Sequence, residues 1–208
     1  MSLTDKSVRD LLAAFRSPDP APGGGSASAL AGAVGSALLA MVAGLPHPRA
    51  AAPEHIERLT DAGGKTARLS EDLSVLIDRD SDAYISVIAA YKLPKSTDGE
   101  KQQRSARIQD ALGEATAVPL EVMRQCAAAI EHASPVAAYG NRNAASDVQV
   151  ALELLLAGLR GARLNVEINL ESLKDQQRVA DVRAEVDRLT NRAENAAASA
   201  RRRLPGGE

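Results

Sequence analysis

The chain has 208 residues, of which 45% are hydrophobic and 25% charged, with a formal net charge of -2, so it can bury the core of one domain. Aromatic residues make up only 2%, and a core of Ala, Leu, Val and Ile favours an all-α protein. Because binding of single-stranded nucleic acid uses stacking aromatics and a positive groove, we expect no nucleic-acid partner.

Apolar residues at helical spacing predict a first helix over residues 4–16, with Thr4 as its cap, ending before the proline-rich segment 18–22. A second helix is expected over residues 26–44, where Pro46 stops it. Its apolar run follows an acid-containing segment rather than a positive one and is shorter than the roughly 20 residues of a membrane span. We therefore expect a buried helix of a cytoplasmic protein with no membrane partner.

A long third helix is predicted over residues 53–91, with a break at Gly63–Gly64 as the alternative. The segment 97–100 matches a capping box, in which side chains satisfy otherwise unpaired N–H groups. A fourth helix therefore runs over residues 98–133, bent at Pro119, which removes one hydrogen bond of the helix.

The next predicted loop covers residues 134–143, after which Ser146 or Asp147 would cap a fifth helix that reaches residue 173. A sixth helix continues to about residue 204, and residues 205–208 are expected to form a disordered tail. Strand alternation and internal repeats are absent from the sequence. It therefore predicts a compact bundle of about six helices, several of them long, in a single domain over residues 1–204.

Three glycines, Gly23, Gly24 and Gly25, stand before Ser26 where the second helix begins. The first N–H groups of a helix have no partner within it, glycine lets a ligand approach the main chain, and the helix dipole adds positive charge. This helix start is a candidate anion site. The alternative is a flexible turn before a closely packed helix, because the Lys and spacing of a P-loop are missing.

An acidic residue, Asp80, lies on the apolar stripe of the third helix, between Ile77 and Tyr84. An unpaired carboxylate on a core-facing stripe loses hydration, which raises its pKa unless a cation or hydrogen-bond donors compensate. Asp80 is therefore a candidate acid–base or cation-stabilising group, and the alternative is a buried Asp paired with an Arg of a neighbouring helix. The stripe consists of Leu69, Leu73, Ile77, Tyr84, Ile88 and Tyr91.

Polar residues also share one stripe of the fifth helix: Asp147, Asn165 and Asn169. Asp147 and Asn165 are separated by about 27 Å along a helix axis, so one site in one subunit does not easily use both. Asn165 and Asn169 are one turn apart and suit an amide-like ligand, whereas Asp147 is more simply a helix cap.

Two loops contribute further polar candidates. Lys95 follows Pro94 just beyond the third helix and becomes functional only if this loop folds over a pocket; otherwise it is simply solvated. Asn141 and Asn143 lie in the loop beside Gly140, where asparagines also occur for conformational reasons alone.

The single cysteine, Cys126, lies among apolar positions and is expected to be core filler rather than a nucleophile. The three histidines are scattered, and neither they nor the cysteine have the spacing of a metal site. We expect no bound metal.

Four motifs occur in order along the chain: residues 20–30, residues 80–84 running into 93–95, residues 140–147, and residues 165–170. With them, residues 11–173 resemble the cyclodeaminase/methenyltetrahydrofolate cyclohydrolase family. The resemblance implies an all-helical homodimer, formed by helix packing, that binds a tetrahydrofolate derivative near the subunit interface with no metal and no other cofactor. It leaves two reactions open: conversion of 5,10-methenyltetrahydrofolate to 10-formyltetrahydrofolate, or release of ammonia from 5-formiminotetrahydrofolate.

The resemblance also implies roles for the candidate residues. Asp80 stabilises the methenyl cation and moves a proton, and Lys95 orients water or binds the glutamate tail. Asn165 and Asn169 hydrogen-bond the pterin, and the helix start at residues 23–26 receives an anionic group. A non-catalytic folate-binding or scaffold protein is the remaining alternative. The other expected substrate-binding residues are Tyr84, Asn141, Asn143 and Asp147.

Overall fold

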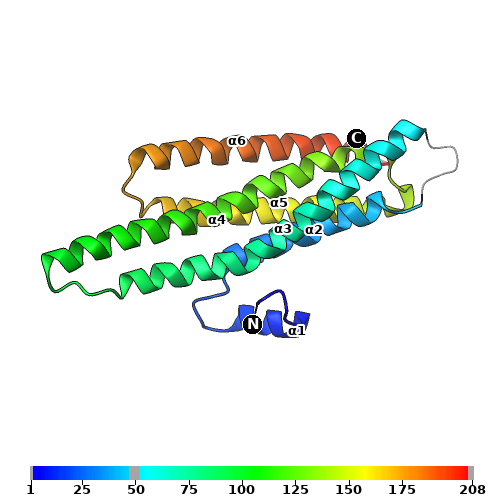
Figure 1. The fold of residues 1–208 in the computed structure, drawn as a ribbon. Helices are drawn as coiled ribbons and strands as arrows, with labels where there is room; N and C mark the ends of the chain where they lie inside the picture. The colour runs from blue at the N-terminus through cyan, green and yellow to red at the C-terminus, as the bar shows by residue number, and fades with distance from the viewer. Residues whose placement is uncertain (1, 47–51, 206–208) are drawn as a thin grey trace.

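A computed structural model describes residues 2–46 and 52–205, and this part of the chain is built from helices alone, as predicted (Figure 1). Residues 206–208 of the predicted tail lie outside the described residues. A short 3₁₀ helix, η1 (Arg142–Ala144), joins α4 to α5. The α-helices are α1 (Val8–Arg16), α2 (Gly24–Ala43), α3 (Pro53–Tyr91), α4 (Asp98–Tyr139), α5 (Ala145–Leu170) and α6 (Gln176–Arg201).

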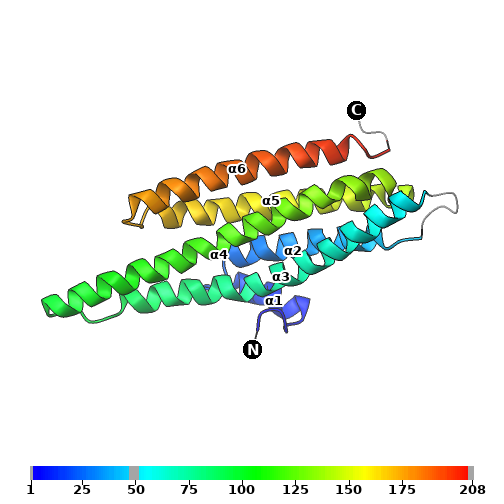
Figure 2. The ribbon, with the colours of Figure 1, turned by 45° about the horizontal axis from the view of Figure 1, so that its top comes forward.

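Among the described residues, five long helices form the bundle. Helix α2 packs against α3 and α5, α4 packs against the same two helices, and α6 lies on α4 and α5. Figures 1 and 2 both show α6 on one side of the bundle and the short α1 on the opposite side, with the α3–α4 hairpin extending beyond the ends of α5 and α6. The predicted compact helical bundle is therefore confirmed.

Helix α2 is held by close backbone contacts. A side chain at Gly35 would come within 2.9 Å of the Ala151 carbonyl oxygen of α5, and one at Gly158 within 2.8 Å of the Ser28 carbonyl oxygen. Cys126 packs against Gly32 and Gly158, fully buried, and burial raises the pKa of its thiol to about 12, so it is core filler as predicted. By length and composition α2 is the one helix of the described residues that is apolar enough to cross a membrane, but 56% of its most apolar window is buried in the fold.

The predicted range of α3 is confirmed, and the helix is continuous through Gly63–Gly64, where a break was the alternative. Two predicted boundaries were wrong. Helix α1 begins at Val8, because Ser7 rather than Thr4 accepts the N–H of Asp10. Helix α4 continues through Pro135 to Tyr139, where a loop was predicted, because Val136 and Ala137 are buried and Tyr139 stacks on His55 at 3.9 Å. Packing there outweighs the hydrogen bond that proline removes.

The caps of α4 and α5 contrast with each other. Thr97 and Glu100 form the predicted capping box at the start of α4. Helix α5 instead begins at Ala145 after η1, and its cap position, Ala144, makes no side-chain cap hydrogen bond. Ser146 and Asp147 therefore lie inside the first turn, so the prediction that one of them caps α5 was wrong. A carboxylate in the first turn is still favourable to the helix dipole.

Candidate functional site

The carboxylate of Asp80 lies directly against the start of α2. Its Oδ2 is 3.1 Å from the Ser26 hydroxyl, and it also accepts the Ser26 backbone N–H. A Cβ atom at Gly25 would overlap this carboxylate, so only glycine leaves room for it. The start of α2 thus binds an anion of the protein itself, the Asp80 carboxylate of α3.

Burial and hydrogen bonding act on Asp80 in opposite directions. Burial raises its pKa, the hydrogen bonds from the Ser26 side chain and backbone lower it, and the net result is a raised pKa. Within residues 2–46 and 52–205, Asp80 forms no ion pair, so the alternative of a neighbouring arginine partner was wrong. A half-buried carboxylate without a cation is poised to bind a cationic ligand or a proton.

The hydroxyl of Ser26 links Asp80 to two further groups. Its Oγ is 2.8 Å from the Ile77 carbonyl oxygen and 3.0 Å from the Ser81 hydroxyl. Ser26 has one hydroxyl proton, which points to Asp80 when the carboxylate is charged and to Ile77 when Asp80 is protonated and donates instead. The buried Ser26 and Ser81 can therefore serve both protonation states of Asp80. Sequence reasoning missed Ser81, although it is the next residue after Asp80.

Asn165 reaches the other side of the same helix start. A Cβ atom at Gly24 would lie 3.6 Å from Asn165 Nδ2, which donates to the Gly161 carbonyl oxygen at 2.9 Å. Asn169, one turn further along α5, donates from Nδ2 to the Ala115 carbonyl oxygen of α4. The structure thus brings Gly24, Gly25, Ser26, Asp80 and Asn165 together, with the exposed Gly23 at the helix cap and Asn169 alongside.

The apolar stripe of α3 loses its cover where α2 begins. Leu73 and Ile77 are buried beneath α2, but Tyr84 and Tyr91, on the same face, are 47% and 49% exposed. The stripe was expected to face the core along its whole length, but it is exposed at Tyr84 and Tyr91, because α2 starts beside Asp80 and does not cover the following turns. Tyr84 consequently presents an aromatic ring one helical turn from Asp80, which suits a planar ligand.

Lys95 is not brought to this cluster within one chain. It is exposed in the turn between α3 and α4, at the tip of the protruding hairpin (Figure 2). The helix from Asp80 to Tyr91 alone spans about 16 Å. Lys95 is thus separated from Asp80 by more than the length of its side chain.

The remaining candidates, Asn141, Asn143 and Asp147, lie at the opposite end of α2. Asn141 donates to the Pro46 carbonyl oxygen at 3.5 Å, and its Oδ1 accepts the N–H of Asn143 at 3.0 Å. Because α2 has 20 residues, this end lies about 30 Å from the Asp80 end. One chain therefore holds two separate groups of candidate residues.

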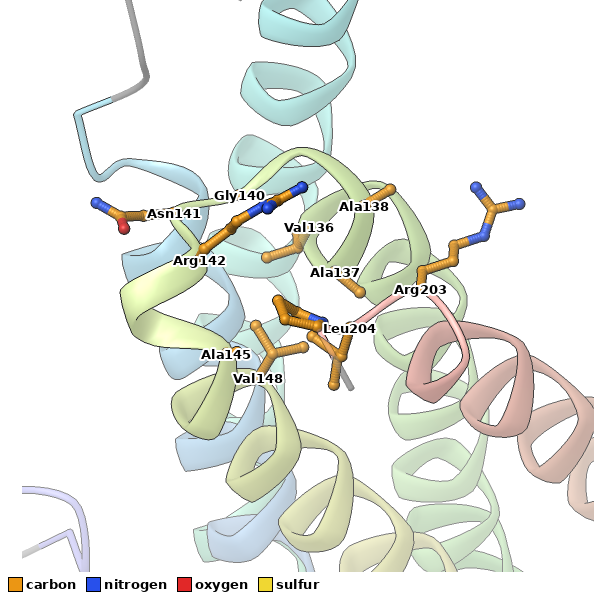
Figure 3. Close-up of a pocket in the computed structure, with 11 residues that line it drawn as sticks. Val136, Ala137, Ala138, Gly140, Asn141, Arg142, Ala145, Val148, Arg203 and Leu204 are labelled. Atoms are coloured by element: carbon orange, nitrogen blue, oxygen red, sulfur yellow. The ribbon is translucent and has the colours of Figure 1, made fainter. Parts of the chain in front are cut away.

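A hollow of about 420 Å³ lies beside this second group (Figure 3). Its walls include Ala145 at the start of α5 and Arg142, and the C-terminal segment at Leu204 closes it. Figure 3 shows Val148 and Leu204 meeting inside, while Asn141 and Arg203 extend outward. The hollow combines the apolar side chains of Val148 and Leu204 with the polar and basic residues Asn141, Arg142 and Arg203. Leu204, which closes it, belongs to no motif that the sequence indicated.

Asp78, two residues before Asp80, fastens the N-terminal segment to α3. It accepts hydrogen bonds from Ser2 Oγ at 2.5 Å, Leu3 N at 2.6 Å and Thr4 Oγ1 at 3.3 Å. Burial acts to raise the pKa of Asp78, but these hydrogen bonds outweigh it and lower the pKa. The contact joins residues more than 70 positions apart, so no local sequence signal predicts it.

Comparisons with known proteins agree with one another. A family model described as Formiminotransferase-cyclodeaminase matches residues 7–188. A methenyltetrahydrofolate cyclohydrolase from Methylorubrum extorquens is 40% identical over 143 residues, covering 69% of each chain. Formimidoyltransferase-cyclodeaminase from Rattus norvegicus is 32% identical over 71% of this chain, which spans 27% of that relative. A solved formiminotetrahydrofolate cyclodeaminase from Thermotoga maritima is similar with a TM-score of 0.85 and 26% identity, covering 96% of each chain.

Proposed function

Since this chain belongs to the formiminotransferase-cyclodeaminase family, we propose that it is a methenyltetrahydrofolate cyclohydrolase, converting 5,10-methenyltetrahydrofolate to 10-formyltetrahydrofolate. The observation that carries the proposal is the Asp80 carboxylate, held half-buried against the start of α2 with no cationic partner among residues 2–46 and 52–205. Its expected ligand is a methenyl group that shares a positive charge between two nitrogens.

The chemistry requires one group that both attracts a cation and moves a proton. In the proposed reaction, water adds to the methenyl carbon while Asp80 takes one of its protons. The tetrahedral adduct then breaks its bond to N5, and Asp80 returns the proton to that nitrogen. The hydroxyl proton of the adduct is released to solvent as its oxygen becomes the carbonyl of the formyl group on N10. A raised pKa suits such a proton shuttle, which typically contributes about 10²–10⁴-fold in rate.

The neighbouring residues hold Asp80 and the substrate in place and take no part in proton transfer. Ser26 holds Asp80 in either protonation state, and Gly25 leaves space for it. In the proposed complex the ring of Tyr84 stacks on the planar pterin, and Asn165 and Asn169 direct amide groups toward its polar edge. In the same complex Lys95, at the hairpin tip, contacts the glutamate tail. The proposal needs no cofactor besides the folate, and it places a homodimer in the cytoplasm, away from nucleic acid and membranes.

A second reaction, formiminotetrahydrofolate cyclodeaminase activity, is favoured by the likeness to the Thermotoga maritima structure over 96% of both chains. Ammonia is then the leaving group, and the product is the same methenyl cation. Asp80 would again transfer the proton and stabilise the developing charge. The two reactions thus use the same carboxylate and differ in the leaving group.

One assay separates these possibilities. Purified protein is given 5,10-methenyltetrahydrofolate, whose loss is followed by absorbance, and in parallel 5-formiminotetrahydrofolate, with ammonia measured. We expect accelerated loss of the methenyl compound. Ammonia release with no cyclohydrolase activity would replace the main proposal by the second. Thermal stabilisation by folate without either turnover would identify a non-catalytic folate-binding protein.

A further inference from the structure

The hydroxyl of Ser81 is turned away from its own helix. Elsewhere in α3, Ser74 and Ser86 each donate to the carbonyl oxygen four residues earlier, at 2.8 and 2.9 Å. For Ser81 the equivalent carbonyl is that of Ile77, which instead receives the hydroxyl of Ser26 of α2 at 2.8 Å. The Ser81 hydroxyl lies 3.0 Å from Ser26 Oγ, its one side-chain partner among residues 2–46 and 52–205. Ser81 is therefore bonded to the start of α2 rather than to a carbonyl of α3.

Among the groups that the structure describes, Ser81 is the one that can donate to Ser26 while Asp80 is charged. Both hydroxyls are buried, so their hydrogen-bond partners are groups of the protein. The partners of Ser26 Oγ are the Ile77 carbonyl oxygen, Asp80 Oδ2 at 3.1 Å and the Ser81 hydroxyl. A carbonyl oxygen and a charged carboxylate only accept hydrogen bonds, whereas a hydroxyl both donates and accepts.

The two protonation states of Asp80 place different demands on these hydroxyls. A hydrogen bond to a charged group is roughly twice as strong as a neutral one, so Ser26 donates to the charged carboxylate. Ser81 then donates to Ser26, and the two bonds run in one direction and polarise each other. When Asp80 is protonated it donates to Ser26 itself, and Ser81 competes with it for the same oxygen. Ser81 thus stabilises the charged form of Asp80 more than the protonated form.

Other charges do not set this equilibrium within the described chain. Helix α2 has no charged side chain, and the α5 side chain at its start is the neutral Asn165. Arg79, next to Asp80, pairs with Glu114 of α4 at 2.9 Å. The pKa of Asp80 is moved by burial and by the hydrogen bonds of Ser26. The remaining titratable side chains within four residues on α3, which do not contribute to that shift, are Asp78, Asp82 and Tyr84.

We propose that Ser81 is a positioning residue for Asp80: by donating to Ser26, it directs the Ser26 hydroxyl at the carboxylate and keeps Asp80 charged until the reaction supplies a proton. The catalytic part of this role rests on the proposed function, in which a charged Asp80 attracts the methenyl cation and later gives its proton to N5. Ser81 is buried, so it acts through Ser26 and does not contact the substrate.

A titration of Asp80 tests the role without any turnover. Protein labelled with ¹³C-carboxyl aspartate is titrated by NMR, and the signal of Asp80 is the one missing from Asp80→Asn. Ser81→Ala removes only the hydroxyl and suits a helix, so the fold is kept. We expect the titration midpoint of Asp80 to rise by about 0.5 unit, because part of one hydrogen bond to its charged form is lost.

The matched control is Ser74→Ala. Ser74 is half-buried in the same helix, and its hydroxyl donates to the Ser70 carbonyl oxygen. The midpoint of Asp80 should stay at the wild-type value in this variant. An unchanged midpoint in Ser81→Ala would overturn the proposal. So would a lowered midpoint, because Ser81 would then accept the Ser26 proton and compete with Asp80 for it.

A double-mutant cycle tests whether Ser81 acts through Ser26. Ser26→Ala removes the hydroxyl that bonds Asp80 directly, so it should raise the midpoint more than Ser81→Ala does. Adding Ser81→Ala to Ser26→Ala should change the midpoint no further, because the connection to Asp80 is already broken. If the two shifts add, Ser81 acts on Asp80 by another route and the proposal is wrong.

The pH profile of turnover tests the catalytic part. The acid limb of kcat/KM with 5,10-methenyltetrahydrofolate reports the protonation of the free enzyme's base, so a rise of half a unit lowers kcat/KM on this limb about threefold. The plateau should stay near the wild-type value. A merely structural loss would lower kcat/KM equally at every pH, and that result overturns the role. If the wild-type protein turns over neither folate, the proposed function fails, while the NMR titration still decides how Ser81 acts on Asp80.

Discussion

A glycine stands at each end of α2, and the two glycines make room for different groups. At the first end, Gly25 makes room for a carboxylate from another helix, and the polar groups of Ser26 and Asp80 hydrogen-bond each other half-buried. At the second end, Gly140 lies against the Val136 carbonyl oxygen of its own chain, beside a hollow that Val148 and Leu204 line. A side chain would displace a functional group at the first end and main chain at the second.

This difference teaches which kind of change each end tolerates. The carboxylate of Asp80 can rotate away from an added side chain, but it then loses the position that catalysis requires. The carbonyl oxygen of Val136 can move only if the backbone of the helix moves with it. We therefore expect substitution of Gly25 to change turnover and substitution of Gly140 to change stability.

The largest effect is expected for Asp80→Asn. The amide keeps the size of the side chain and can still accept the Ser26 N–H, but it neither carries a charge nor takes a proton. Turnover of the folate substrate should fall by about 10²–10⁴-fold, with an unchanged helical circular dichroism spectrum. Steady-state kinetics with 5,10-methenyltetrahydrofolate measure this, and near-normal turnover would refute the role of Asp80.

Gly25→Ala should have the next largest effect, because its methyl group overlaps the carboxylate of Asp80. Displacing a catalytic group by about 1 Å can reduce the rate on the order of 10²-fold. The control is Gly64→Ala in α3, where an added Cβ meets nothing within 4 Å. The control should keep its activity and gain up to about 1 kcal/mol of stability from helix propensity. Equal activities of the two variants would contradict the proposed contact.

Gly140→Ala should reduce stability rather than turnover. Its Cβ would overlap the Val136 carbonyl oxygen and lie 3.2 Å from Val42 Cγ1, so the end of α4 has to shift. Overpacking of this kind typically costs about 1–3 kcal/mol, measurable by urea unfolding. If Gly140→Ala were as stable as the wild type but inactive, the expected difference between Gly25 and Gly140 would be refuted.

The pH dependence of stability should differ between the wild type and Asp80→Asn. The pKa of Asp80 is raised above its ordinary value of 3.8, so the folded chain binds more protons than the unfolded chain between that value and its own pKa. The free energy of unfolding of the wild type therefore falls, relative to the variant, as the pH rises through this window, and the difference is constant above it. Urea unfolding of both proteins from pH 3 upward checks this sign.

The smallest effect is expected for Asp78→Asn, which weakens the hydrogen bonds to Ser2, Leu3 and Thr4. Because Asp78 is only partly buried, the loss of stability should be about 1 kcal/mol or less. Hydrogen exchange at the Leu3 amide should accelerate. In the wild type the same loosening should appear as the pH falls through the lowered pKa of Asp78. Unchanged exchange in the variant would show that Asp78 does not fasten this segment.

Local signals in the sequence predicted most of the fold. Helical periodicity, the capping box at Thr97 and the proline-rich breaks identified every long helix, because each depends on neighbours within one or two turns. The end of α4 was predicted wrongly, since burial of Val136 and the stacking of Tyr139 on His55 involve distant residues. The sequence indicated Asp80 as a polar residue on an apolar stripe. It did not indicate whether an arginine of another helix pairs with Asp80, because that depends on how the helices pack.

The amino-acid sequence by itself determined the helices, the charge-free α2 and the residue types available for folate chemistry, because these follow from composition and from spacing along the chain. Only the tertiary structure decided that Asp80 lies on Gly25, that Ser81 joins it through Ser26, and that Asn141 is a whole helix away. Those relations join residues more than 50 positions apart in the first two cases and nearly 100 in the last. They depend on how the helices pack, which no local pattern encodes.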